Sequence, residues 1–148
     1  MSRISLEEFR EITRGSLPFA AAMGVEAVAI EAGRARFRLP YRADFLRPGG
    51  TIGGPLLMGL ADVAMYAVVL SAVGRQELAV TSNLTMNFLR KPGPAAVVAE
   101  ARLLRLGRRL AFGAVELFTE GDPEMVAHAT LTYALPSGYA LPSGSAVS

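Results

Sequence analysis

The sequence predicts an α+β fold in which a curved antiparallel sheet wraps around one long, apolar central helix at about residues 55–73. The first observation is a run of 19 residues, Pro55 to Val73, in which Asp62 is the only charge. A helix that is apolar nearly all round must be surrounded by other elements. The second observation is that strand-like segments lie on both sides of this run, two before it and four after it. A curved sheet built from these strands would enclose the helix.

Two short helices are predicted before the first strand, within residues 1–23. Residues 5–8 (Ser-Leu-Glu-Glu) fit a capping box, in which the serine and the second glutamate each bond a free backbone N–H at the start of a helix. A second helical stretch runs from Leu17 to Met23. The chain is therefore expected to open with two short helices that precede the sheet.

Two strands follow, at 25–32 and 34–39, with Gly33 at the turn between them. The second strand alternates apolar residues with three arginines, which is the pattern of a strand with one wet face. These arginines are Arg34, Arg36 and Arg38. No aromatic residues interleave with them on that face, so we interpret them as solvated rather than as a nucleic-acid site.

Residues 42–54 hold Pro48 and four glycines, and we expect a loop that lets the backbone approach a ligand closely. Pro55 suits the first turn of the long helix, because its missing N–H would have no intrahelical partner, and Gly74 is expected to end the helix. The length of this helix would also suit a membrane span. Asp62 in its middle and the lack of a flanking Lys or Arg cluster favour a helix enclosed by its own protein.

Four further strands complete the predicted sheet. They are expected at 79–90, 95–105, 108–119 and 124–134. Short segments rich in Pro, Gly and Asp separate them, which predicts an antiparallel meander of consecutive strands. The hexapeptide Tyr-Ala-Leu-Pro-Ser-Gly then occurs twice within 133–144. We interpret 1–135 as a single domain and 136–148 as a flexible tail.

The composition excludes several kinds of chemistry. The chain has no Cys and one His, which excludes disulfides, Cys nucleophiles and metal sites that need Cys or two His ligands. His128 lies on a late strand, and the sequence has no Gly-x-Ser-x-Gly elbow for a Ser-His-Asp triad. A net charge of +2 is too small to hold the chain on nucleic acid. The first residues lack the pattern of a secretory signal, so the expected location is the cytoplasm.

Three segments of the chain carry a family resemblance. They are 47–55 (Arg-Pro-Gly-Gly-Thr-Ile-Gly-Gly-Pro), 60–66 (Leu-Ala-Asp-Val-Ala-Met-Tyr) and 81–92 (Thr-Ser-Asn-Leu-Thr-Met-Asn-Phe-Leu-Arg-Lys-Pro). With them, about residues 15–135 resemble the hotdog-fold acyl-CoA thioesterases, most closely the phenylacetate-type (PaaI-like) branch. The resemblance implies the hotdog fold and an enzyme that hydrolyses an acyl-CoA thioester to free acid and CoA, without a metal or redox cofactor.

The resemblance implies roles for three residues. Asp62 matches the helix carboxylate that acts as general base or nucleophile, and apolar surroundings make a carboxylate a stronger base. Gly54 matches the glycine whose N–H polarises the thioester carbonyl, and a helix N-terminus suits an oxyanion. Thr81 matches a Ser/Thr that orients water, with Ser82 and Asn83 beside it. The alternatives are an Asp that fixes the dimer register, a glycine that serves only the turn and a threonine that is only a strand residue.

Two positions depart from the family pattern. Gly53 stands where the family usually has His, and Arg47 corresponds by spacing to an Asn that helps to place substrate or water. An Arg cannot accept a hydrogen bond, so it cannot replace that Asn directly. Cations at strand ends are candidates to bind the phosphates of coenzyme A, and a solvated turn is the alternative for each pair. These cations are Arg90, Lys91, Arg108 and Arg109.

The resemblance also implies self-association. In the family the site is composite, formed where two subunits join their sheets side by side, and dimers frequently pair into tetramers. The departures at Arg47 and Gly53 leave a second function open, a hotdog protein that binds acyl-CoA or another apolar acid without turnover. A hotdog hydratase or dehydratase is a third possibility, but it needs an Asp and His pair that is not apparent here.

Overall fold

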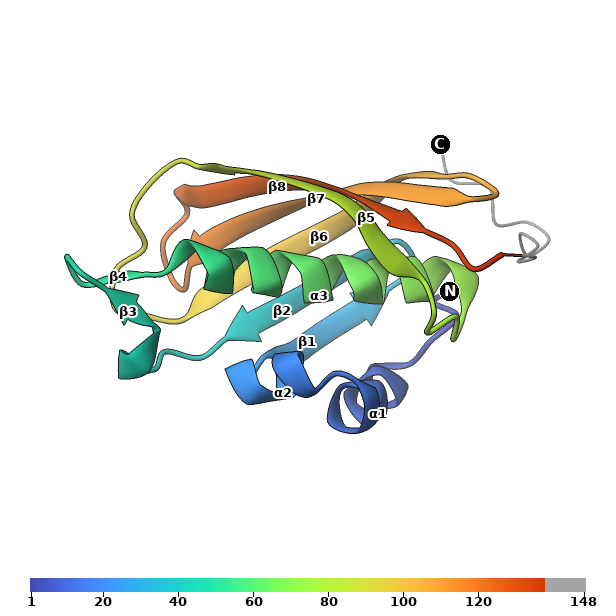
Figure 1. The fold of residues 1–148 in the computed structure, drawn as a ribbon, viewed down its shortest axis with the longest axis horizontal. Helices are drawn as coiled ribbons and strands as arrows, with labels where there is room; N and C mark the ends of the chain where they lie inside the picture. Colours follow the sequence, from blue (N-terminus) through green and yellow to red (C-terminus); the bar gives the residue numbers. More distant parts are fainter. Residues whose placement is uncertain (138–148) are drawn as a thin grey trace.

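The computed structural model describes residues 1–137, which form a curved six-stranded antiparallel sheet around one long helix, α3 (Gly54–Val73) (Figure 1). Helix α3 crosses the concave side of the sheet. Helix α1 (Leu6–Ser16) packs beside the first strand, and α2 (Pro18–Met23) packs beside α3. This arrangement confirms the predicted fold class, and the central helix begins one residue earlier than predicted.

The strand order in the sheet is β1-β2-β6-β7-β8-β5, with every pair antiparallel. The strands are β1 (Glu26–Glu31), β2 (Arg34–Leu39), β5 (Val80–Phe88), β6 (Val97–Leu106), β7 (Leu110–Thr119) and β8 (Met125–Ala134). All six predicted strands form, but the predicted meander is wrong at its first step, because β5 pairs with β8 and not with β6. Only β6, β7 and β8 follow one another as a meander.

The connection between β5 and β6 explains this difference. Residues 89–96 include Pro92 and Pro94, which lack the backbone N–H that a hairpin ladder needs. The segment instead carries the chain from β5 at the sheet edge to β6 near its centre (Figure 1). On the way it contacts the segment that leads into α3, where the Ile52 N–H donates to the Pro92 carbonyl at 3.4 Å. It is a crossover rather than a turn.

The predicted loop at 42–54 contains more structure than expected. It holds a short 3₁₀ helix, η1 (Ala43–Phe45), and a two-stranded hairpin, β3 (Leu46–Arg47) with β4 (Thr51–Ile52). Gly49 and Gly50 have φ of 95° and 75°, and these left-handed conformations allow the hairpin to reverse within three residues. The hairpin delivers the chain to the N-terminus of α3.

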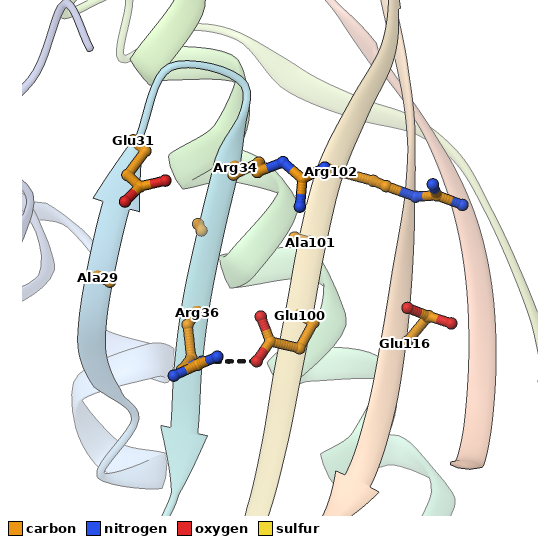
Figure 2. A pocket seen from close by; sticks show the side chains of 9 residues that line it. Ala29, Glu31, Arg34, Arg36, Glu100, Ala101, Arg102 and Glu116 are labelled. Atoms are coloured by element: carbon orange, nitrogen blue, oxygen red, sulfur yellow. Dashed lines mark hydrogen bonds and ion pairs between the residues drawn. The ribbon is translucent and has the colours of Figure 1, made fainter. Parts of the chain in front are cut away.

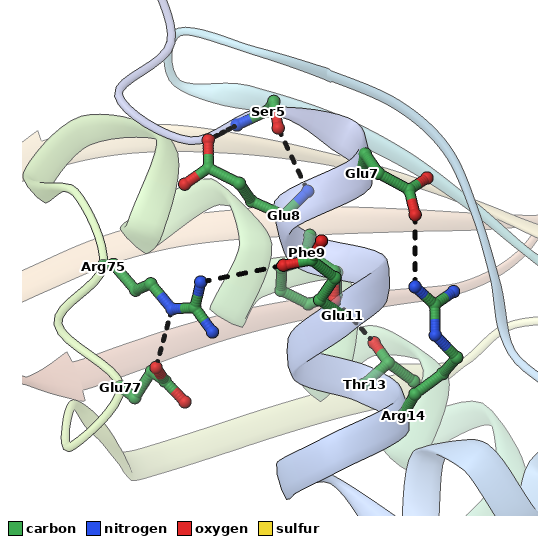
Figure 3. A network of polar contacts seen from close by, with 9 residues as sticks. All are labelled: Ser5, Glu7, Glu8, Phe9, Glu11, Thr13, Arg14, Arg75 and Glu77. Carbon is green, nitrogen blue, oxygen red and sulfur yellow. Dashed lines mark hydrogen bonds and ion pairs between the residues drawn. The ribbon is translucent and has the colours of Figure 1, made fainter.

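The predicted capping box of α1 is confirmed. Ser5 Oγ accepts a hydrogen bond from the Glu8 N–H at 3.0 Å, and the Ser5 N–H donates to Glu8 Oε1 at 3.1 Å (Figure 3). The buried Phe9 then packs edge-on against Tyr66 of α3, with the ring centroids 5.9 Å apart. Through Phe9, helix α1 thereby contacts the middle of α3.

Helix α3 is the core of the domain and not a membrane span. By length and composition it could cross a bilayer, but 67% of its most apolar window is buried inside the protein. Leu60, Ala61, Ala64 and Met65 have no exposed surface. The membrane alternative is therefore dropped for this helix. The predicted tail at 136–148 lies outside the described residues from position 138 onward, so it stays a prediction.

Gly113 in β7 marks a close approach of α3 to the sheet. A Cβ at this position would lie 2.5 Å from Met65 Cε and 2.6 Å from the Arg102 carbonyl oxygen, which is backbone and cannot move aside. We therefore expect Gly113→Ala to lower the free energy of unfolding by about 2–3 kcal/mol. Denaturant unfolding measures the change, with Gly93→Ala as the control because its added Cβ meets nothing within 4 Å. Equal stability of the two variants would contradict this account.

Candidate active site

Asp62 lies on the face of α3 that turns toward α2 and the start of β5. Gly59 and Tyr66 share this face because they lie three residues before and four residues after Asp62 along the helix, and Val63 borders it. Together with Phe19 and other residues of α2 they line a cleft of about 630 Å³. Most of this lining is apolar, so the cleft suits an apolar group with one carboxylate at its wall.

Two hydroxyl groups hold the Asp62 carboxylate. Thr81 Oγ1 donates to Asp62 Oδ1 at 2.6 Å, and the Tyr133 hydroxyl donates to the same oxygen at 2.7 Å. The Tyr133 hydroxyl also lies 3.0 Å from the Asp62 carbonyl oxygen. Within residues 1–137 no group donates to Oδ2. The surroundings of Asp62 are thus less purely apolar than predicted, and the carboxylate has one held oxygen and one without a protein donor.

A β-bulge turns the Thr81 side chain toward Asp62. Thr81 pairs with Tyr133 and Asn83 pairs with Thr132, so Ser82 is an extra residue in β5. Further along β5, Leu84 packs against the core, and strict alternation from Leu84 would turn Thr81 away from α3. The bulge shifts the alternation by one residue and brings Thr81 onto the same face as Leu84. Neither Ser82 nor Asn83 contacts Asp62; Asn83 Oδ1 accepts from the Thr85 hydroxyl at 3.2 Å.

Gly54 begins α3, and Gly53 is its N-cap residue. In the described part of the chain, no acceptor takes the Gly54 N–H, whereas the Leu56 N–H donates to the Gly53 carbonyl at 3.1 Å. The Gly54 N–H is therefore an available donor at the positive end of a long helix. A Cβ on Gly54 would lie 3.3 Å from the Phe88 ring at the end of β5. A larger residue would crowd both the ring and the approach to this N–H.

Gly54 and Asp62 are too far apart to act together within one chain. Eight residues separate them along α3, which corresponds to about 12 Å at the helical rise. Asp62 contacts Thr81 at the start of β5, and Gly54 lies against Phe88 at its end. The two predicted catalytic groups thus lie at opposite ends of the same edge strand.

The predicted substrate-binding residues lie apart from Asp62. Arg47 is exposed in the β3–β4 hairpin, and its guanidinium donates to the Pro48 carbonyl at 3.4 Å. Arg90 follows β5 near the Gly54 end and lies 3.6 Å from both Asp122 and Glu124. The exposed Lys91 is the next residue.

The second pair of predicted cations lies at the other end of the sheet. Arg108 and Arg109 occupy the turn between β6 and β7, where the Leu135 N–H donates to the Arg109 carbonyl at 2.8 Å. The register pairs Leu110 with Ala134 and places Ala134 opposite Val80, so this turn lies toward the start of β5. One chain therefore does not bring the two cation pairs together.

The convex face of the sheet carries a shallow, charged hollow of about 270 Å³, far from Asp62 (Figure 2). Arg36 donates to Glu100 at 2.5 Å there, and Arg34 and Arg102 lie beside this pair. Arg38 pairs with Glu26 and Glu120 on the same strand face. Arg36 and Arg38 therefore form ion pairs on this face of the sheet. No group of three or more His, Asp or Glu that could hold a metal occurs in the described residues.

Sequence reasoning missed Tyr133. Alternation along β8 predicts that its side chain faces the core, and the residue is indeed buried. Its contact with Asp62 joins residues 71 positions apart in the chain, and no local pattern encodes such a contact. The only signal in the sequence was this alternation, which predicts a phenol buried in the core near the central helix.

Comparison with known proteins now adds to this geometry. The family model described as Thioesterase superfamily matches residues 49–126. A crystal structure from a Silicibacter species, provisionally described as a thioesterase, is 38% identical with a TM-score of 0.83, over 92% of this chain and 94% of that one. A variant of the phenylacetic acid degradation protein PaaI from Thermus thermophilus is 32% identical with a TM-score of 0.71, over 80% of this chain and 99% of that one. A protein of Saccharolobus solfataricus, provisionally named an esterase, is 28% identical over 107 residues, which are 72% of this chain and 75% of that protein.

Proposed function

The chain belongs to the thioesterase superfamily, in its PaaI-like hotdog branch, and on this premise we propose that it hydrolyses acyl-CoA thioesters to free acid and CoA. In this proposal Asp62 is the general base or nucleophile, the Gly54 N–H is the oxyanion donor and Thr81 assists Asp62. One observation carries the proposal: at the wall of an apolar cleft lies a carboxylate with one oxygen held by two hydroxyls, while the other has no donor among residues 1–137.

The proposed reaction balances with side chains and water alone. Water attacks the thioester carbonyl carbon while Asp62 takes its proton, and the carbonyl oxygen becomes an oxyanion that the Gly54 N–H stabilises. The carbon–sulfur bond then breaks, and the CoA thiolate takes the proton from Asp62. In the nucleophilic variant, Asp62 attacks first, CoA leaves and water hydrolyses the resulting anhydride. Neither route uses a metal or a redox cofactor.

A second copy of the chain would complete the site. Strand β5 is an edge strand whose outer side has no partner in the described residues, and Val80 and Phe88 at its two ends are 58% and 53% exposed. Two-fold antiparallel pairing of β5 with its copy, centred between Leu84 and Thr85, would place Thr81 opposite the partner's Phe88.

This pairing would join the two halves of the proposed site. Thr81 holds Asp62, and Phe88 lies against Gly54. The carboxylate of one subunit would therefore face the helix N-terminus of the other, and the dimer would contain two such sites. A further pairing of dimers into a tetramer stays a prediction.

The same pairing would gather the cations. The chain that follows β5 in one subunit, with Arg90 and Lys91, would lie next to the sheet end that holds Arg108 and Arg109 in the other. These residues are exposed and could contact the phosphates of coenzyme A at the mouth of the cleft. Coenzyme A would then lie across the subunit interface.

A panel of acyl-CoA substrates tests the proposed function. We expect the wild-type protein to release free CoA thiol from apolar acyl-CoAs and to favour them over succinyl-CoA by about tenfold or more in kcat/KM, because the cleft beside Asp62 is mostly apolar. The panel contains short, medium, long and aromatic acyl groups, and the rate is expected to be unchanged by a chelator. Binding of acyl-CoA without release of thiol from any of them would overturn the proposal in favour of a binding protein.

A further inference from the structure

We propose that Tyr133 is the positioning residue of this site: its phenol fixes the Asp62 carboxylate so that Oδ2 is left for water or thioester. The inference rests on the proposed function of Asp62. The Tyr133 hydroxyl lies 2.7 Å from Oδ1 and 3.0 Å from the carbonyl oxygen of the same residue. One phenol thus contacts both the side chain and the backbone of Asp62, which restricts the rotation of the carboxylate about its side-chain bonds.

The phenol is itself held in place by its neighbours. Tyr133 is 3% exposed, and its ring stacks on Tyr66 with centroids 6.0 Å apart and planes at 23°. The Tyr66 hydroxyl donates to the Glu77 carbonyl at 2.9 Å, and the Tyr66 ring packs against Phe9 of α1. Residues from α1, α3 and β8 therefore fix the position of the Tyr133 hydroxyl relative to Asp62.

Tyr133 remains a donor over the working pH range. Burial, and then the neighbouring Asp62 carboxylate, raise the pKa of Tyr133 well above its ordinary value. The phenol therefore keeps its proton. Thr81 donates to the same oxygen, but its side chain is exposed and its hydroxyl can rotate to other partners. Of the two donors, Tyr133 is the one with a fixed direction.

Packing alone does not account for the hydroxyl. A phenylalanine would fill the same core position and stack on Tyr66 without a polar atom. Burying a hydroxyl costs free energy unless it finds an acceptor, and here the acceptor is Asp62. The hydroxyl of Tyr133 is therefore explained by its hydrogen bond to the Asp62 carboxylate and not by packing in the core.

The first test removes only this oxygen. Tyr133→Phe is expected to lower kcat by about 10- to 100-fold while KM stays within about twofold, because a misplaced carboxylate slows the chemical step more than it weakens binding. Rates are normalised to the folded fraction from an unfolding curve. Ser71→Ala is the matched control: it removes a buried hydroxyl that bonds Gly33 and Val68 outside the site, so it is expected to lower stability and to leave kcat unchanged.

The second test asks whether Tyr133 acts through Asp62. In an Asp62→Asn background, adding Tyr133→Phe is expected to change the residual rate by less than about twofold, because the two substitutions remove one shared function. An unchanged kcat in Tyr133→Phe, or a full additional loss in the double variant, would overturn the inference. If Asp62→Asn alone keeps the wild-type rate, the proposed function of Asp62 fails instead, so the two failures are distinguishable.

Discussion

Replacing Asp62 with Asn is expected to lower kcat for acyl-CoA hydrolysis about 1,000-fold, with KM close to the wild-type value. An amide neither accepts the proton of water nor attacks a thioester. It does keep the shape of the carboxylate, and its carbonyl oxygen can still accept from Thr81 and Tyr133. The cleft and the binding of substrate are therefore retained while the chemical step is lost. Release of CoA thiol and calorimetric titration of acyl-CoA measure the two effects separately.

Asp44→Asn is the matched control for this substitution. Asp44 is exposed and pairs with Arg42, which holds the pKa of this carboxyl below its ordinary value. It does not line the cleft, so Asp44→Asn is expected to keep the wild-type kcat. A wild-type rate in Asp62→Asn would remove Asp62 from the mechanism. In a single turnover in ¹⁸O-water, label found in the Asp62 carboxylate would identify Asp62 as the nucleophile, because the general-base route places the label only in the product acid.

The parts of the fold that were predictable are those that local sequence encodes. The apolar run of α3, the capping box of α1 and the alternation of β2 each depend on residues close together in the chain. The position of β5 depends on a different kind of information. Its neighbour is β8, almost 40 residues later, and the prolines at 92 and 94 looked like turn signals although they belong to a crossover. Local turn chemistry does not specify which strands pair.

The candidate site shows the same division. Asp62 stood out because it is the only charge in a long apolar segment, whereas Gly54 was singled out by its match to the family glycine at the start of the helix. The resemblance favoured Thr81 over Ser82 and Asn83, but strand alternation alone could not make this choice, because the bulge at Ser82 changes which side chain faces α3. Alternation along β8 could place Tyr133 in the core, but its contact with Asp62 could not be predicted, since that contact exists only in the folded arrangement of β8 and α3.

A mixture of two inactive variants is expected to recover activity if the site is shared between subunits. Gly54→Val crowds Phe88 and the oxyanion donor and is expected to lower kcat about 100-fold, and Asp62→Asn removes the carboxylate. In a dimer of one Gly54→Val chain and one Asp62→Asn chain, one shared site carries both substitutions and the other carries neither. Random pairing makes about half of the dimers mixed, so co-expression is expected to restore about a quarter of the wild-type activity.

The reciprocal mixture separates a shared site from a site within one chain. When a double variant carrying both substitutions is co-expressed with wild type, each site of a mixed dimer has one lesion, and only the wild-type dimers, about a quarter of the total, stay active. If each chain held its own complete site, this mixture would instead keep about half of the activity, and the first mixture would recover none. We expect recovery in the first mixture, because a helical rise of about 12 Å separates Gly54 from Asp62 within one chain. If the reciprocal mixture kept about half of the wild-type activity while the first mixture stayed inactive, the pairing of β5 with its copy would be contradicted.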